Sequence, residues 1–103
     1  MPEFEIQQEG NLARVAPGGD VLASSMSGLR PAMRDLVRSG VREIVVDLAA
    51  TSMIDSTGVG LLLAAFNSMQ AAGGKFSIVH ASDEILELLR TMRMHQHFSV
   101  SGR

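Results

Sequence analysis

The sequence contains no cysteine, tryptophan or tyrosine, and its aromatic residues are four phenylalanines. Without cysteine the chain forms no disulfide, uses no thiolate in catalysis and binds no zinc through sulfur. With so few aromatic rings, a stacking surface for bases or sugars is not expected. These absences remove several classes of enzyme and cofactor site, and we expect no cofactor.

The sequence also has no block of like charge and no long apolar run. The nine Lys and Arg residues are scattered and the formal net charge is -2, which argues against nucleic acid or an anionic membrane as partner. The longest mainly apolar stretch, Val59 to Phe66, is too short to cross a bilayer, and the acidic N-terminus lacks a signal-peptide core. We therefore expect a soluble cytoplasmic protein.

The chain has enough apolar material for one core. It has 103 residues, of which 46% are hydrophobic, which fits a single domain spanning residues 1–103. Alternating or β-branched runs predict strands, and apolar residues at helical spacing predict helices. The expected strands are 4–8, 12–15, 43–48, 75–80 and, at the end, a short one at 98–100; the expected helices are 26–39, 59–72 and 82–92.

Several residues refine these elements. Phe4 to Gln8 alternates like a half-buried strand, and Glu43 to Leu48 reads as a strand buried on both faces. Pro31 predicts a late start or a kink in the first helix. The serines upstream of that helix are candidate caps, namely Ser24, Ser25 and Ser27. The order β-β-α-β-α-β-α predicts an α/β fold with a mixed sheet of four to five strands covered by helices.

One turn carries the candidate chemistry. Asp55-Ser56-Thr57-Gly58 follows a buried strand and opens a helix. Asp55, Ser56 or Thr57 is suited to capping that helix, and the free N–H groups of a helix start favour an anion. Gly58 and Gly60 are expected to leave room for such an anion.

Three interpretations of this turn follow from local chemistry. The first is ordinary helix capping. The second is a phosphate-binding loop, although the turn lacks both G-x-G-x-x-G and G-K-[ST]. The third is a nucleophile elbow, which requires G-x-S-x-G, whereas Ile54 stands at the first glycine position. A catalytic serine also needs a base, and the histidines, His80, His95 and His97, have no recognisable context.

The pattern over the whole chain resembles the STAS-domain family of anti-sigma-factor antagonists. The resemblance rests on a hydrophobic strand ending in Asp47-Leu48, a short spacer and then Ile54 to Gly60. It extends to the two opening strands, a glycine turn at Gly19, the first helix, the Gly73-Gly74 break and the closing helix.

The resemblance implies a non-enzymatic partner switch. In that family the serine after the motif aspartate, here Ser56, is phosphorylated by a partner that is both kinase and anti-sigma factor. The unphosphorylated protein binds that partner, and a phosphatase resets the phosphorylated form. The residues expected at the partner surface are Asp20, Leu22, Ser24, Ile54, Asp55, Ser56, Thr57, Gly58 and Val59.

The sequence departs from the family at one position. Many antagonists carry a Gly-Glu-Leu-Asp-like turn whose aspartate contacts the partner, and Leu22 stands at that position here, with Asp20 nearby as a substitute. A non-switching STAS subunit of a transport or signalling assembly and a small serine-dependent enzyme remain alternatives. Thr57 is expected to cap its helix and is the alternative phosphoacceptor.

Other polar residues are expected to be structural. His95-Gln96-His97 lacks a third metal ligand and is expected to be a solvated tail. Asp47 is expected to cap the loop at Thr51-Ser52. No metal site is expected, although Asp47 and Asp55 together offer two carboxylates near one sheet edge.

Overall fold

The computed structural model describes residues 4–24 and 27–103 of the chain. Its elements, in chain order, are β1 (Phe4–Glu9), β2 (Leu12–Pro17), α1 (Leu29–Arg38), β3 (Glu43–Asp47), α2 (Ser56–Ala71), β4 (Lys75–Ala81), α3 (Asp83–Thr91), the short 3-10 helix η1 (Met94–Gln96) and β5 (Ser99–Gly102). The predicted order is confirmed, including the terminal strand.

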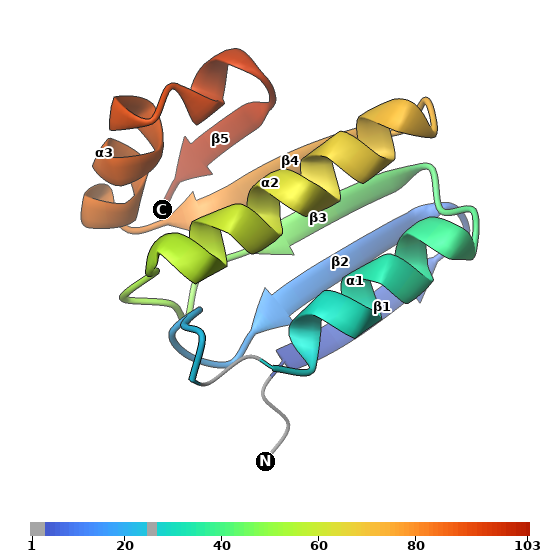
Figure 1. The fold of residues 1–103 in the computed structure, drawn as a ribbon, viewed down its shortest axis with the longest axis horizontal. Coiled ribbons are helices and arrows are strands. Elements are labelled where there is room, and N and C mark those ends of the chain that lie inside the picture. The colour runs from blue at the N-terminus through green and yellow to red at the C-terminus, as the bar shows by residue number, and fades with distance from the viewer. Residues whose placement is uncertain (1–3, 25–26) are drawn as a thin grey trace.

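One mixed sheet organises the molecule. Its strand order is β1-β2-β3-β4-β5; β1 and β2 form an antiparallel hairpin, and the other neighbours pair in parallel. Figure 1 shows α1 and α2 side by side over one face of the sheet, with α3 beside β5. Because β2 and β3 are parallel, their carboxyl ends meet at one sheet edge, from which the connections to α1 and α2 leave.

The core lies between this face and the helices. Ile44, Val46 and Ile78 of the central strands and Leu62 and Met69 of α2 are each no more than 1% exposed. Burying a side chain of this size stabilises a fold by about 1.5–3 kcal/mol. The helices are therefore held by their apolar faces.

Two predictions of strand burial are wrong. Of β1, Phe4 packs against the core, but Ile6 is 37% exposed, and β1 is an edge strand of the sheet. In β3, Val45 is only half-buried, opposite the half-buried Arg14 of β2, because α1 and α2 cover a single face of the sheet.

The predicted serine caps of α1 are also wrong. Its N-cap is Gly28, which makes no side-chain hydrogen bond, so neither Ser24 nor Ser27 has the capping role. Ser25 and Met26 lie outside the described residues. The helix starts at Leu29, so Gly28 holds the cap position.

Helix ends agree better with prediction. Pro31 lies in the first turn of α1, where its missing N–H costs no intrahelical bond. Gly40, directly after α1, has a φ of 87°, a left-handed conformation that glycine adopts without strain. Ser82 caps α3 by accepting a hydrogen bond from the Ile85 N–H.

The segment after α3 is folded onto the core; His95 to His97 are exposed, as predicted, but they belong to η1 and the turn after it and not to a tail. Phe98 is buried, and its ring centroid lies 5.0 Å from those of Phe66 and Phe76. The His97 ring lies 6.0 Å from that of Phe66. The aromatic cluster holds η1 against α2 and leads the chain into β5.

Candidate functional site

Two loops join at the carboxyl ends of β2 and β3. We call residues 18–24 and 48–55 the loop pair. Val21 and Ile54 form an isolated parallel bridge between them. The Val21 N–H donates to the Met53 carbonyl at 3.0 Å, and the Asp55 N–H donates to the Val21 carbonyl at 3.3 Å. The loop pair therefore extends the sheet by one isolated β-bridge.

Side chains hold the loop pair from within. Asp20 Oδ1 accepts hydrogen bonds from the N–H groups of Ser52 and Met53, each at 3.0 Å. Thr51 is completely buried, and its Oγ1 donates to the Gly19 carbonyl at 2.8 Å. Because a buried polar group without a partner is costly, these bonds fix the path of both loops.

Arg103, the residue after β5, also reaches the loop pair. Arg103 Nη2 donates to the carbonyl oxygens of Ala49 at 2.8 Å and Thr51 at 3.3 Å. Charged donors make the stronger class of hydrogen bond. A residue at the far end of the chain thus supports the segment that leads to α2.

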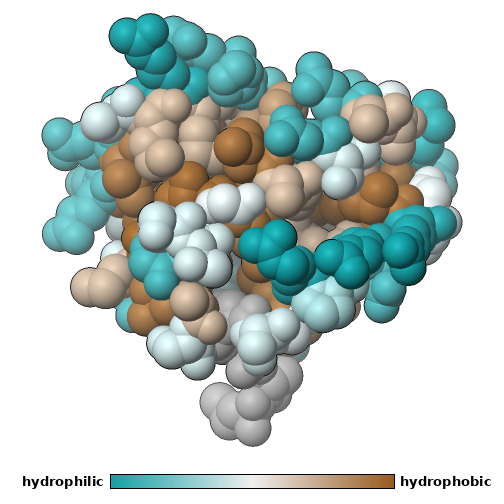
Figure 2. Space-filling view, in the orientation of Figure 1, coloured by the Kyte–Doolittle hydropathy of each residue, from teal (hydrophilic) through white to brown (hydrophobic). Residues whose placement is uncertain are grey.

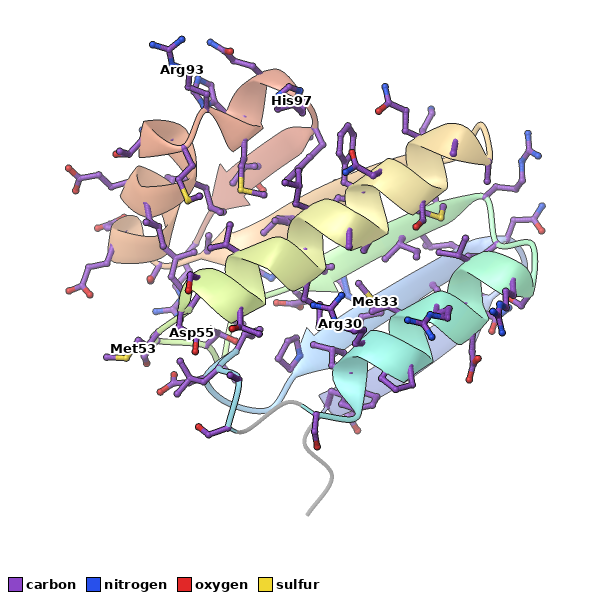
Figure 3. The ribbon with its side chains drawn as sticks, in the orientation of Figure 1. Arg30, Met33, Met53, Asp55, Arg93 and His97 are labelled. Atoms are coloured by element: carbon purple, nitrogen blue, oxygen red, sulfur yellow. The ribbon has the colours of Figure 1, made fainter. Side chains whose placement is uncertain are left out.

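Asp55 is the N-cap of α2 and settles the capping alternatives left open by the sequence. Its Oδ1 accepts from the Gly58 N–H at 2.8 Å, and its Oδ2 accepts from the Ala23 N–H at 3.0 Å. Figure 3 shows Asp55 between the start of α2 and the neighbouring loop. One carboxylate therefore caps the helix and ties it to the β2–α1 connection.

The same bonds act on the ionisation of Asp55. The hydrogen bond from the Ala23 N–H, followed by that from Gly58, holds the pKa of this carboxyl below its usual value and outweighs the small effect of desolvation. Asp55 is therefore a carboxylate at neutral pH, fixed beside Ser56.

Ser56 and Thr57 are the exposed residues of the first turn of α2. Because Asp55 makes the cap, the Ser56 hydroxyl takes no part in the hydrogen bonds of the described residues. The predicted capping role of Thr57 is wrong for the same reason. Both hydroxyls are left accessible at a helix start.

Gly58 fits a close contact between α2 and the loop pair. A Cβ built on it would overlap the Val21 carbonyl oxygen and lie 2.8 Å from Ile54 Cγ2, whereas a Cβ on Gly60 would meet nothing within 4 Å. The expectation that Gly58 leaves room for an anion is therefore wrong. It lets the helix start approach the Val21–Ile54 bridge.

The predicted partner residues divide into three groups by exposure. Ser24, Ser56 and Thr57 are exposed; Asp20, Leu22 and Asp55 are half-buried; Ile54, Gly58 and Val59 are buried. Ile54 and Val59, which were expected to offer a partner apolar contact, are 8% and 5% exposed and pack in the core; their contact with a partner stays a prediction.

The apolar side chain that the site does expose is Met53, at 60%. Figure 3 shows it projecting away from the fold close to Asp55. The sequence analysis selected Ile54 and Val59 and missed Met53, because it did not take into account the direction in which each side chain points. Alternation in the extended segment before Asp55 was the available signal, since adjacent side chains point to opposite sides.

A hollow of about 290 Å³ adjoins the exposed Thr57. Leu22 and Ala23 line it from the loop pair, Thr57 and Gly58 from α2, and Arg30 from α1. The structure thus brings Leu22, which replaces the expected aspartate, close to the start of α2. Arg30 is a second residue that the sequence did not single out.

The histidines of the described residues have other surroundings than Ser56. His80 Nδ1 lies 3.0 Å from Asp47 Oδ1, and no histidine of this part of the chain hydrogen-bonds to Ser56. Nor does this part contain a group of three or more His, Cys, Asp or Glu residues that could hold a metal ion. None of its helices is long and apolar enough to span a membrane.

Asp47 has a structural setting of its own. Its Oδ1 also accepts from the Ala49 N–H at 3.0 Å, so the predicted cap at Thr51-Ser52 is wrong by two residues. Desolvation raises the pKa of Asp47. The hydrogen bonds from Ala49 and His80 and the charge of Arg14 lower this pKa by more, so the net shift is downward.

The comparisons with known proteins agree with this geometry. The sequence matches the STAS domain over residues 3–102. The chain belongs to the STAS domain family. This confirms the resemblance drawn from Asp47-Leu48 and the turn at Ser56.

Solved structures share the STAS fold over nearly the whole chain. The Thermotoga maritima protein TM1081 matches with a TM-score of 0.89 and 16% identity over 97% of this chain and 86% of that one. An anti-sigma factor antagonist from Mycobacterium paratuberculosis matches with a TM-score of 0.85 and 17% identity over 97% and 85%.

The Bacillus cell fate determinant SpoIIAA in its phosphorylated form matches with a TM-score of 0.79 and 16% identity, covering 97% of this chain and 91% of that one. SpoIIAA in its unphosphorylated form, an anti-sigma factor antagonist, matches with a TM-score of 0.74 and 18% identity over 84% and 81%. At these identities the likeness shows the fold.

Proposed function

We propose that this STAS protein is an anti-sigma-factor antagonist that works as a phosphorylation-controlled partner switch and not as an enzyme. Ser56 is the phosphoacceptor. The unphosphorylated surface binds a partner that is both serine kinase and anti-sigma factor, phosphorylation releases the protein, and a phosphatase resets it. Because the kinase takes its phosphoryl group from ATP, the switch operates in the cytoplasm.

One observation carries the proposal: Ser56 is exposed while its neighbours hold the helix start. Capping is done by Asp55 and close packing by Gly58, so the Ser56 hydroxyl is available for modification. A phosphate there leaves the hydrogen bonds of the loop pair in place. The modification therefore acts on the surface and not on the fold.

The charges next to Ser56 make the change large. A phosphate adds a charge of about -1.5 to -2 at neutral pH. It would join the ionised Asp55, whose pKa is already lowered by backbone hydrogen bonds. Two adjacent anions repel an acidic partner group and are costly to desolvate, and about 3 kcal/mol of lost interaction lowers an affinity about a hundredfold.

The comparisons support this mechanism by analogy. SpoIIAA, which shares the fold, has been solved in phosphorylated and unphosphorylated forms. The partner surface we propose comprises the exposed residues Ser24, Met53, Ser56 and Thr57 with the half-buried Asp20, Leu22 and Asp55.

The test combines phosphorylation with binding. The protein and its Ser56→Ala and Thr57→Ala variants are incubated with the candidate kinase, ATP and magnesium, and intact mass is measured. We expect one phosphate on the parent and on Thr57→Ala, and none on Ser56→Ala. Binding to the kinase should fall about a hundredfold for Ser56→Asp.

Other outcomes separate the alternatives. Phosphate on Ser56→Ala but not on Thr57→Ala would move the switch to Thr57. No phosphate on any variant, with Ser56→Asp binding a stable assembly as well as the parent does, would favour a non-switching subunit. Covalent labelling of Ser56 by a phosphonate probe would favour an enzyme.

A further inference from the structure

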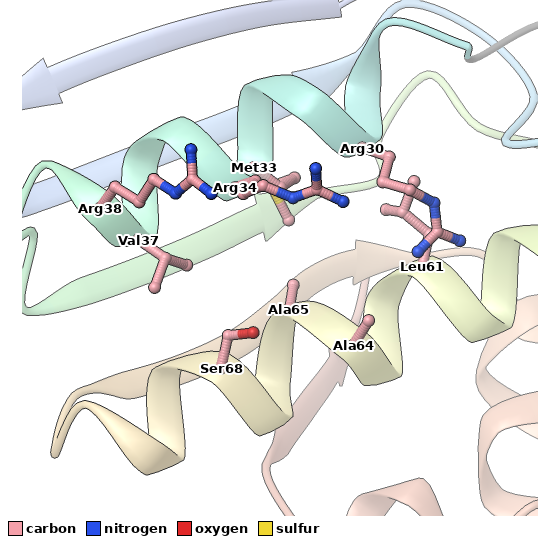
Figure 4. Close-up of a pocket in the computed structure, with 9 residues that line it drawn as sticks. All are labelled: Arg30, Met33, Arg34, Val37, Arg38, Leu61, Ala64, Ala65 and Ser68. Atoms are coloured by element: carbon pink, nitrogen blue, oxygen red, sulfur yellow. The ribbon is translucent and has the colours of Figure 1, made fainter.

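A groove runs between α1 and α2, beyond the surface proposed for the switch. It has a volume of about 310 Å³ and is shown in Figure 4. Its floor is apolar and comprises Met33, Val37, Leu61, Ala64 and Ala65, with Ser68 at one end. Arg30, Arg34 and Arg38 of α1 form its rim. We call this the arginine groove.

The rim arginines carry uncompensated positive charge. All three are exposed, and none makes an ion pair within the described residues, where the ion pairs involve Asp47 with Arg14 and His80. No acidic residue lines the groove. In a chain of net charge -2, three aligned and unpaired cations mark a surface complementary to anions.

Figure 2 shows the same combination on the molecular surface. Strongly hydrophilic side chains form a row along α1 and border hydrophobic surface between α1 and α2. An occupant must therefore offer both apolar groups for the floor and several negative charges for the rim.

The spacing of the arginines fits a helix as occupant. They recur every four residues on α1, so successive Cα atoms rise by about 6 Å along the axis. A partner helix with carboxylates at i, i+4 and i+8 repeats the same rise, and its other face presents apolar residues to the floor. A single bound lipid molecule brings one charged headgroup and would leave the remaining arginines without a partner, and an extended anionic membrane is tested separately below.

The groove also continues toward the start of α2. Arg30 and Leu61 line both the arginine groove and the hollow that contains Thr57 and Gly58. A helix lying in the groove would therefore end next to the start of α2.

We propose that the arginine groove binds an acidic amphipathic helix of a partner protein. This docking goes beyond the proposed switch and does not depend on phosphorylation of Ser56. It gives the protein a second binding surface, which a partner recognises by the pattern of arginine charges. This surface is additional to the one that Ser56 controls.

The probe is a synthetic helical peptide with leucines on one face and glutamates at i, i+4 and i+8 beside them. Its affinity for the full chain is measured by fluorescence anisotropy at low and high salt. We expect saturable binding that weakens as salt rises, because exposed ion pairs are screened. A peptide with lysine in place of each glutamate should not bind.

Matched variants locate the site. Arg38 and Arg90 are both exposed and lie in the last turn of a helix, α1 and α3 respectively. Arg38→Glu should weaken binding about fivefold or more, because it replaces attraction by repulsion, whereas Arg90→Glu should leave binding unchanged. Circular dichroism of both variants checks that each remains folded.

A second pair tests the floor. Ala64 and Ala71 are both exposed on α2, and only Ala64 lines the groove. Ala64→Leu should fill the groove and weaken binding, and Ala71→Leu should not. Equal loss in both members of either pair, equal binding of the lysine peptide, or absence of binding at millimolar peptide would overturn the proposal. Binding to phosphatidylglycerol vesicles in place of the peptide would also overturn it, in favour of a lipid surface.

Discussion

Helices α2 and α3 begin with the same N-cap hydrogen bond, but an aspartate makes it in α2 and a serine makes it in α3. In α3, Ser82 accepts from the N–H three residues on, and Asp83 and Glu84 follow in the first turn. In α2, Asp55 makes the equivalent bond, and the first turn carries no acidic residue. In α3 the serine is the cap and is therefore occupied. In α2 the acid is the cap and leaves Ser56 accessible.

The difference shows how a helix start can keep its N-cap and still leave a serine accessible for phosphorylation. Acidic residues in a first turn are favourable because of the helix dipole. The first turn of α3 has this charge permanently. The start of α2 carries only the charge of its cap, Asp55, and under the proposed function phosphorylation adds further negative charge on demand. The predictions below test this contrast, beginning with the largest expected effect.

Gly58→Ala should be the most disruptive change at the start of α2. The new Cβ would overlap the Val21 carbonyl oxygen, and because backbone cannot rotate away we expect a loss of about 3 kcal/mol, at the upper end for overpacking. Gly60→Ala is the control, since its Cβ meets open space and should stabilise the helix by about 0.5–1 kcal/mol. Urea unfolding measures both; equal stability of the two variants would contradict the close contact.

Removing the two caps should separate their roles. Ser82→Ala should cost about 1 kcal/mol, as is typical of an N-cap. Asp55→Ala should cost more, because it also removes the hydrogen bond from the Ala23 N–H. Thermal unfolding of the two variants measures the difference, and an equal loss would show that the bond between the loops adds nothing.

The two caps should also differ in their response to acid. The pKa of Asp55 is lowered in the folded state, so its contribution is present above its unfolded pKa and is lost as pH falls through its folded value, below about pH 4. Urea unfolding from neutral pH to about pH 3 should show a smaller decline for Asp55→Asn than for the parent.

Asp47, whose pKa is also lowered, contributes to the same decline, and Asp47→Asn measures its share. Ser82 does not ionise, and Ser82→Ala should follow the parent profile at a lower stability. If Asp55→Asn declines as steeply as the parent, the hydrogen bonds to this carboxylate are not what favours its ionised form.

The smallest effect is expected from adding a charge to the α2 start. Ser56→Asp should change the free energy of unfolding by no more than about 0.5 kcal/mol, because Ser56 is exposed and surface substitutions act weakly. Asp83→Ser in α3 should lose about 0.3–1 kcal/mol. A large loss of thermal stability in Ser56→Asp would mean that the charge acts through the fold instead of the surface.

The sequence predicted most of the framework because periodicity and turn residues are local signals. The hairpin, the central strands and the start of α3 at Ser82 followed directly from them. The position of Ser56 at a helix start followed in the same way, and the family resemblance supplied its interpretation. Burial of β1 and β3 was mispredicted because it depends on which sheet face the helices cover.

Details of the site were not predicted from the sequence for a similar reason. That Ile54 points inward and Met53 outward depends on the bridge to Val21, a contact between residues far apart in sequence. The role of Gly58 depends on the same contact. The hydrogen bonds from Arg103 to the loop pair join residues about half the chain apart, and no local sequence pattern predicts them.

The hydrogen-bonded loop pair also matters for protein design. Its bonds run through backbone groups and through Asp20, Thr51 and Asp55, and the side chains at positions 56 and 57 take no part in them. The framework is therefore a display scaffold in which two adjacent surface positions are open to replacement. A library varied at these positions, on an unchanged backbone, would let new binding specificities be selected without redesigning the fold.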